Sequence, residues 1–189
     1  MKLRDLVVRN RSYRRFVQSP RPDRALLKEL VDLARLTASG ANLQPLRYWL
    51  VDNPTDCALV FPHTSWAGLL GGWRPAADEA PTAYVLVLEA EGGVTPQADA
   101  GIAMQTLLLA ATEKGYGGCI IGSIKRDKIR AALGISEAFK ILYAVALGKP
   151  SEKAVVEDAV DFNVDYYRAA DDIHHAPKHK LETLIINGL

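Results

Sequence analysis

One segment of the sequence, residues 97–115, limits the possible folds more than any other. It contains the run DAGIAMQTLLLAATEK, which is apolar almost all the way round and has no wide polar face. A helix of this kind must be covered on every side, and a segment of this length makes about 28 Å of helix. A chain of 189 residues has little core with which to enclose it. We therefore expect burial at an interface between two subunits, the alternative being the central helix of one large core.

The composition indicates one domain. Hydrophobic residues make up 49% of the chain, which is enough for one well-buried core but hardly for two. The 23 Lys and Arg nearly balance the 22 Asp and Glu, so the totals give no support to a nucleic-acid partner. Cys57 and Cys119 stand in no CxxC or Cys/His spacing, which argues against a disulfide scaffold or zinc site and suits a reducing cytoplasm. Neither a signal peptide nor a membrane span is predicted, and we expect a cytoplasmic protein.

Helices and strands are expected to alternate along most of the chain. The predicted helices are 3–9, Pro22 to about Leu36, 97–115 and a segment capped by Ser123 and closed by Gly134; the predicted strands are Leu46–Val51, Thr82–Glu89 and Ile141–Leu147. This order predicts an α/β or α+β sandwich. No GxGxxG or P-loop follows a strand, so a Rossmann or Walker site has no support. The polar tail from about residue 151 has no core of its own and is expected to pack on the partner subunit.

A basic segment near the start of the chain is a candidate phosphate site. Arg11, Ser12 and Arg14, with Arg9 and Arg15 beside them, offer guanidinium forks and a hydroxyl within a few residues. Arginine matches phosphate geometry bidentately, and a serine hydroxyl can satisfy a remaining oxygen. The alternative is a solvated run of charge.

Two further motifs suit a flat ligand. The segment Ser39–Pro45 combines small residues, which allow close approach of the backbone, with the amide side chains of Asn42 and Gln44. Gly117 and Gly118 permit unusual backbone angles and expose N–H groups. The alternatives are an ordinary helix end with a turn in the first case and a plain tight turn in the second.

The remaining candidates lie in a long loop and in the tail. The stretch from Phe61 to Pro81 has the length and aromatic content of a lid, with His63, Trp66 and Trp73 as its candidates. The alternative is that the tryptophans pin the loop to the core. In the tail, the histidines of HHAPKHK have no acidic or Cys partner at a convincing spacing, so no metal is predicted. Lys178 and Lys180 could instead add positive charge at a phosphate.

Taken in order, these motifs are similar to those of the nitroreductase family. The similarity runs from residue 5 to 187 and rests on four matches: RSYRRF at 11–16, Ser39–Pro45, Gly117-Gly118, and the pair Lys178 and Lys180. It implies an α+β fold, a three-layer α-β-α sandwich with a central, mainly antiparallel sheet. It also implies a homodimer that holds FMN between its subunits. Two positions depart from the family pattern: Asn10 stands where a further Arg is common, and Leu46 where an aromatic residue is common.

The resemblance also implies a role for each motif. Arg11, Ser12 and Arg14 would hold the phosphate and ribityl chain of FMN, helped by Lys178 and Lys180. Ser39 and Asn42 would reach the flavin from the opposite subunit, with Gln44 near that edge. Gly117 and Gly118 would lie against the ring. No side chain need act as nucleophile or obligatory acid, because the flavin supplies the redox chemistry.

The implied activity is that of an FMN-dependent oxidoreductase. NADH or NADPH would reduce the flavin, and a nitroaromatic, quinone or other flat acceptor would then be reduced in a ping-pong cycle. One alternative is another flavin protein of this fold: a dehalogenase, a sensor or a flavin-fragmenting enzyme. The resemblance disfavours the flavin-fragmenting enzyme, because Ser12 stands at the position where that branch has an Asp. A different alternative is a module that binds nucleic acid or an acidic partner through Arg9–Arg15.

Overall fold

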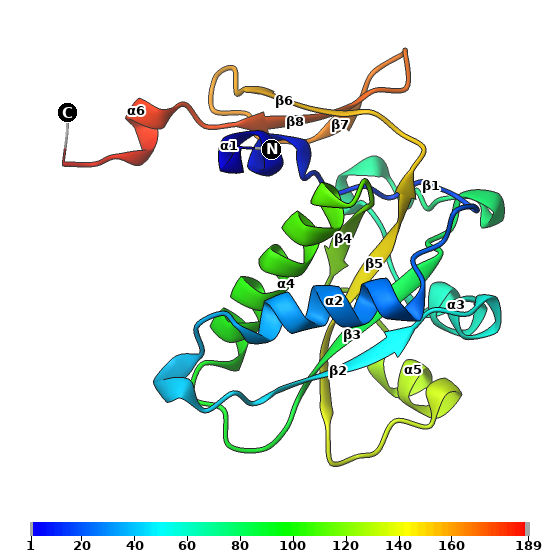
Figure 1. Ribbon diagram of the computed structural model, residues 1–189. Helices are drawn as coiled ribbons and strands as arrows, with labels where there is room; N and C mark the ends of the chain where they lie inside the picture. Colours follow the sequence, from blue (N-terminus) through cyan, green and yellow to red (C-terminus); the bar gives the residue numbers. More distant parts are fainter. Residues whose placement is uncertain (1, 188–189) are drawn as a thin grey trace.

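The computed structural model describes residues 2–187 and is built around an antiparallel sheet (Figure 1). The strands follow the order β2-β3-β5-β4, and the two-residue strand β1 pairs with the end of β5. Their bounds are β1 Phe16–Val17, β2 Leu46–Val51, β3 Ala83–Glu89, β4 Gly117–Ile121 and β5 Lys140–Pro150. Strand β2 has the predicted bounds, β3 begins one residue later than predicted, and β5 extends beyond its prediction at both ends. Strands β1 and β4 were not predicted.

Helices cover both faces of this sheet. One face carries α2 (Arg24–Arg35) and α4 (Pro96–Glu113), and the other carries α3 (Pro54–Val60) and α5 (Arg126–Leu133). Alternate residues of β3 point into the two layers: Ala83, Val85 and Val87 into the first, and Tyr84, Leu86 and Leu88 into the second. All six are buried. The predicted three-layer α-β-α sandwich with an antiparallel sheet is therefore confirmed.

Local sequence signals set the ends of the helices. The Asp23 side chain caps α2 by accepting a hydrogen bond from the Leu26 N–H at 2.8 Å. Gly134 ends α5 with a φ of 67°, in the left-handed region that favours glycine. The predicted cap at Ser123 is wrong, because α5 begins at Arg126 and no side chain caps it. The Ser123 carbonyl instead accepts a hydrogen bond from the Ser65 N–H at 2.9 Å, which fixes the loop after α3.

Helix α4 is largely covered by its own chain. Nine of its residues are buried, among them Ala103, Leu107 and Ala111. What remains open is a narrow strip with Gly101 and Gln105 exposed and Ile102 44% exposed. The core of one chain therefore accounts for most of the apolar character of this helix. Burial of the open strip in a subunit interface stays a prediction.

The tail forms a small sheet of its own. Strands β6 (Ala154–Asp158), β8 (His174–Lys178) and β7 (Tyr167–Arg168) lie in that order, and helix α1 (Leu3–Arg9) contacts α4. The short helix α6 (Leu181–Leu184) projects from the body. Apart from His174, the residues of this tail sheet are half-buried or exposed, which agrees with a tail that lacks a core. No helix within residues 2–187 combines the length and apolar character needed to cross a membrane.

Candidate functional site

The basic segment and the glycine pair come together in space. Residues 10–15 run from α1 to β1 alongside the start of β4. Ser12 forms a β-bridge with Gly118, and the Tyr13 N–H donates to the Gly118 carbonyl at 3.0 Å. Two motifs that stand a hundred residues apart in the sequence thus form one surface.

The arginines of the basic segment differ in what they contact. Arg11 donates from Nη2 to the Val7 carbonyl at 2.6 Å, while its buried Nε has no hydrogen-bond partner in the part of the chain that the structure describes. Burial lowers the pKa of Arg11. Arg14 donates from Nη1 to Nε2 of His174 at 3.1 Å, and its guanidinium lies over the Tyr166 ring, 5.1 Å from the ring centre.

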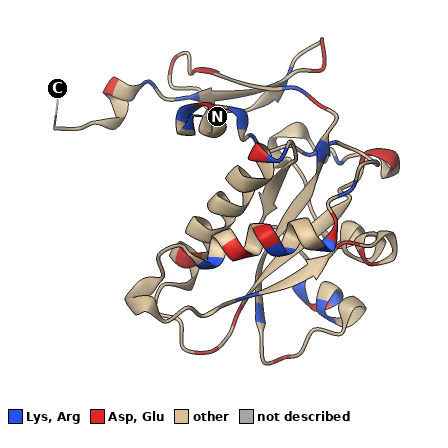
Figure 2. Ribbon diagram, in the orientation of Figure 1, with Lys and Arg blue, Asp and Glu red and all other residues tan. Residues whose placement is uncertain are grey.

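Arg15 has a different environment from its neighbours. It pairs with Glu79 at 2.6 Å and also with Asp172, so carboxylates of the same chain already neutralise its charge. Figure 2 shows acidic residues beside basic ones here and along α2. Arg15 therefore holds together the basic segment, the 61–81 loop and the tail.

Glu152 completes this arrangement, and the sequence did not single it out. Its Oε1 accepts hydrogen bonds from the backbone N–H groups of Arg14 and Arg15, the second at 3.1 Å. Its Oε2 pairs with Arg168 at 2.6 Å, and the Glu152 side chain is only 2% exposed. A buried carboxylate therefore fixes the backbone from which the Arg14 side chain extends.

A cavity of about 200 Å³ opens beside Arg14. Its walls come from β4, the 61–81 loop and the tail, and include Trp66, Cys119, Gly122 and Tyr166. Sites for drug-sized ligands usually measure ~300–1,000 Å³, so one chain supplies a partial site. Cys119 is buried, and burial raises the pKa of its thiol to about 12, so it is a thiol rather than a thiolate at neutral pH.

The candidate lid residues are held within the fold. Trp66 is 6% exposed and lies in the core cluster under the sheet, with its ring centre 6.1 Å from that of Phe61. Trp73 is half-buried under the Arg168 guanidinium, which lies 5.3 Å from its ring centre. His63 is half-buried, and its carbonyl accepts a hydrogen bond from the Lys125 N–H. These contacts favour the alternative that the tryptophans pin the loop, and a lid stays a prediction.

The glycine pair is packed against its own chain. A Cβ on Gly118 would overlap the backbone carbonyl of Ala146 on β5, and a Cβ on Gly117 would overlap the Tyr13 ring and Pro150. Close packing of β4 is thus a sufficient reason for two glycines here. Contact with a flavin ring stays a prediction for both.

The loop after α2 has an unusual backbone. Ala41, Asn42 and Gln44 all have positive φ, at 48°, 55° and 49°, a region that non-glycine residues seldom occupy. The side chains of Asn42 and Gln44 are exposed and hydrogen-bond each other at 3.2 Å. Ser39 turns inward: its hydroxyl donates to Oδ2 of Asp99 at 2.6 Å and accepts from the Gln44 N–H at 3.0 Å.

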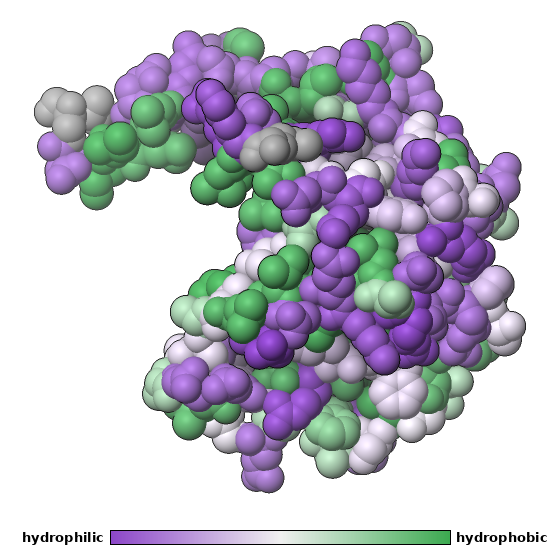
Figure 3. Space-filling model, in the orientation of Figure 1, coloured by the Kyte–Doolittle hydropathy of each residue, from purple (hydrophilic) through white to green (hydrophobic). Residues whose placement is uncertain are grey.

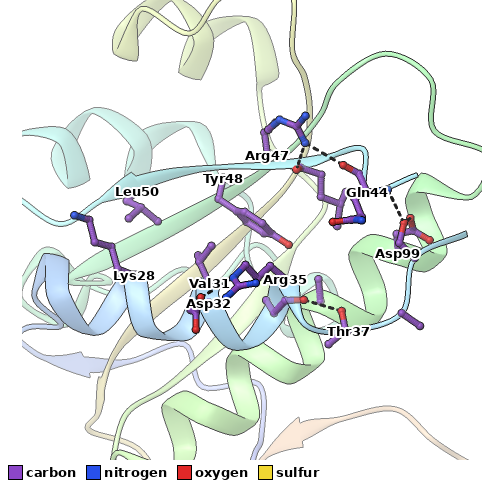
Figure 4. A pocket seen from close by; sticks show the side chains of 15 residues that line it. Lys28, Val31, Asp32, Arg35, Thr37, Gln44, Arg47, Tyr48, Leu50 and Asp99 are labelled. Atoms are coloured by element: carbon purple, nitrogen blue, oxygen red, sulfur yellow. Dashed lines mark hydrogen bonds and ion pairs between the residues drawn. The ribbon is translucent and has the colours of Figure 1, made fainter. Parts of the chain in front are cut away.

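A second cavity, of about 450 Å³, lies beside this loop between α2 and β2 (Figure 4). Its walls are mostly apolar, with Val31 and Leu50 among them, and Arg35, Gln44 and Arg47 stand around it. Ser39 and Gln44 of this loop line the second cavity, whereas Arg14 of the basic segment lines the cavity beside β4.

Lys178 and Lys180 do not line the cavity that Arg14 borders. Lys178 ends β8, and Lys180 precedes α6 and borders a third cavity of about 260 Å³ with Phe162 and His179. Both lysines are exposed. In the part of the chain that the structure describes, no group of three or more His, Cys, Asp or Glu side chains is placed to hold a metal ion.

Comparison with known proteins gives a consistent result. A model of the nitroreductase family matches residues 7–149. The chain is similar to a nitroreductase family protein from Clostridium novyi NT, with 19% identity, a TM-score of 0.66, and coverage of 96% of this chain and 98% of that one.

Two more solved structures have the same fold. The first is a mutant of NfnB from Sphigopyxis sp. strain HMH, described as an FMN and NADPH-dependent nitroreductase: 20% identity, a TM-score of 0.63, and coverage of 80% and 89% of the two chains. The second is iodotyrosine deiodinase bound to FMN and 3-iodo-L-tyrosine: 20% identity, a TM-score of 0.66, and coverage of 86% and 99%.

Proposed function

Because this chain belongs to the nitroreductase family, we propose that it is an FMN-dependent oxidoreductase that works as a homodimer. NADH or NADPH is the electron donor, and a nitroaromatic, quinone or other flat molecule is the acceptor. The solved relative described as FMN and NADPH-dependent supports this choice of cofactor and donor.

The proposal of a dimer rests on the distance between the loop 39–44 and the pair Gly117-Gly118. The loop 39–44 contacts the first turn of α4 through Asp99, whereas Gly117 and Gly118 follow the other end of that helix (Figure 1). Helix α4 has 18 residues, which corresponds to about 27 Å. One flavin cannot reach both groups in a single chain. If both contact one FMN, they must come from different subunits.

The residues of the basic segment fit the phosphate end of FMN. The buried Arg11 Nε has no hydrogen-bond partner among residues 2–187, the Ser12 side chain is exposed, and the Arg14 guanidinium borders the cavity next to β4. Lys178 and Lys180 would add charge from the tail. Asn42 and Gln44 of the partner's copy would meet the ring edge with their amide groups.

Bound FMN would supply two-electron chemistry, with the protein orienting it and excluding water. Trp66, Cys119 and Gly122 line the cavity beside β4, and the Trp66 and Cys119 side chains are largely buried in the wall behind it. The cavity residues therefore need only bind and orient donor and acceptor.

Exposed apolar side chains on several elements support pairing of two chains. Exposed apolar side chains lie on α1 (Leu3, Val7), on α4 (Ile102) and on α6 (Leu181, Leu184). Figure 3 shows hydrophobic residues on the projecting C-terminal segment and around the hollow beneath it. Exposed patches of this kind mark interaction sites. We place the partner subunit there, with the arm from about residue 151 packing on it.

Purified protein tests the proposal directly. We expect a yellow dimer whose visible absorbance is bleached by NADH or NADPH and restored by a nitroaromatic or quinone. Ile102→Glu should yield a monomer that has lost FMN, whereas Leu59→Glu, a similarly exposed apolar position on α3, should leave both properties unchanged. A wild-type monomer that is indifferent to added FMN would refute the proposal.

The proposed contact between Arg14 and the FMN phosphate can be tested separately. Arg14→Gln should weaken FMN binding about tenfold or more, because one charge-assisted hydrogen bond is lost. Arg24→Gln removes a guanidinium that pairs with Asp52 at the start of α2, and it should leave FMN binding unchanged. Equal FMN affinities of the two variants would show that Arg14 does not contribute to FMN binding.

A panel of acceptors decides among flavin enzymes of this fold. It should include 3-iodo-L-tyrosine, because a structure of the same fold binds that ligand. Turnover of halogenated tyrosine in preference to nitroaromatics and quinones would assign a dehalogenase instead. A colourless protein that retains oligonucleotides would point to the nucleic-acid alternative.

A further inference from the structure

The loop 39–44 holds a conformation that its own residues do not favour. Ala41 and Gln44 carry a Cβ and still have φ values of 48° and 49°. For L-residues this region brings Cβ close to the following carbonyl oxygen. Asn42, at 55°, tolerates it better. Such a backbone persists only where surrounding contacts hold it in place.

Asp99 provides those contacts. This carboxylate is 4% exposed and lies in the first turn of α4. Its Oδ2 accepts from the Ser39 hydroxyl at 2.6 Å, and its Oδ1 accepts from the Gly40 N–H and the Thr95 hydroxyl, each at 3.0 Å. The hydrogen bonds from Ser39 and Gly40 lower the pKa of Asp99, so the side chain is ionised at neutral pH.

The contact continues from Asp99 into the loop. Ser39 donates to Asp99 and, through the same oxygen, accepts the N–H of Gln44. Gly40 lies so close to α4 that a Cβ there would overlap the Thr95 hydroxyl. Both ends of the turn are therefore fixed to the start of α4, and the side chains of Asn42 and Gln44 are left facing out.

We propose that Asp99 is a positioning residue that sets the loop 39–44 in the conformation needed to present Asn42 and Gln44 to FMN in the dimer. Ser39 serves as the link between Asp99 and Gln44 rather than as a cofactor ligand. This inference rests on the proposed function, since the loop would meet the flavin held by the partner subunit.

The first test is substitution of Asp99 by its amide. Asp99→Asn keeps the size of the side chain but replaces one acceptor oxygen by a donor, so Ser39 or Gly40 loses its partner. We expect FMN affinity to fall about tenfold and backbone N–H exchange at Gly40 and Gln44 to accelerate. Asp127→Asn is the matched control, an acidic residue in the first turn of α5, and it should bind FMN like the wild type.

A double-mutant cycle separates positioning from general stability. If Asp99 acts through Asn42, then Asn42→Ala should weaken FMN binding in the wild-type background and much less in the Asp99→Asn background. Ser39→Ala, a milder change in the same chain of contacts, should reproduce the effect and serves if Asp99→Asn does not fold. Additive effects of Asp99 and Asn42 would overturn the inference, as would unchanged exchange at Gly40 and Gln44.

The outcomes distinguish the two proposals. If the wild type and Asp127→Asn bind FMN while Asp99→Asn binds it equally well, only the role of Asp99 is lost. If the wild type binds no FMN, the proposed function fails and this inference fails with it.

Discussion

Removal of the Glu152 carboxylate should destabilise the protein far more than removal of an exposed carboxylate. In the fold, the Glu152 side chain is 2% exposed and accepts hydrogen bonds from two backbone N–H groups and from Arg168, whose side chain is 15% exposed. Glu152→Ala leaves two backbone donors without this acceptor, and it leaves the largely buried Arg168 guanidinium with Asp172 alone as a carboxylate partner among the described residues. Breaking a buried pair from one side costs about 3–5 kcal/mol. For a chain of this size each kcal/mol lowers Tm by roughly 2–4 °C, so we expect a fall of about 6–20 °C.

Two further variants make this measurement specific. Glu137→Ala breaks the 3.3 Å pair with Arg130, in which the Glu137 side chain is 87% exposed. Exposed pairs contribute about 0–1 kcal/mol, so Tm should change by no more than about 4 °C. Glu152→Gln keeps a carbonyl acceptor but loses the charge, and it should fall between the two. Calorimetry of the protein without cofactor is the assay, and equal Tm values for Glu152→Ala and Glu137→Ala would refute the reasoning.

Three other outcomes are expected. Burial and the nearby Arg14 guanidinium hold the pKa of His174 below its usual value. The free energy of unfolding should therefore fall as pH drops through about 6.5, where an unfolded histidine takes up a proton. In a calorimetric pH series, His174→Gln should flatten this dependence on pH, and an unchanged dependence would contradict the role of His174. Burial raises the pKa of Cys119 to about 12, so mass spectrometry should find it alkylated by iodoacetamide at neutral pH only after unfolding. Gly118→Ala should cost about 1–3 kcal/mol, because its Cβ would overlap a carbonyl of β5, whereas Gly122→Ala meets only ordinary contacts and should show little change in a urea titration.

The sequence predicted the layers of the fold well. Strand β2 has the predicted bounds, and β3 is apolar at nearly every position because both its faces are buried between helices. The tail sheet could not be predicted in the same way. Its strands have no buried face, so no period-two pattern of apolar residues marks them.

The candidate site was predicted in part. The motif Arg11–Phe16 and the pair Gly117-Gly118 meet as neighbours, although nothing in their spacing requires it. Asp99 and Glu152 were missed, because a single carboxylate has no signature until the fold surrounds it with donors. The resemblance placed Ser39 at the flavin of the opposite subunit, which stays a prediction, and nothing in the sequence indicated that its hydroxyl donates to Asp99. Polar residues that support a site from behind resemble ordinary helix or loop residues in a sequence.

The contacts of Glu152 bear on how this protein should be divided for experiments. The family match ends at residue 149, and a truncation at that boundary would look natural. It would nevertheless delete the acceptor for the backbone of Arg14 and Arg15, together with His174, which contacts the Arg14 side chain. The basic segment and the tail therefore support each other, and a shortened version would test a protein in which the backbone of Arg14 and Arg15 has lost a carboxylate acceptor.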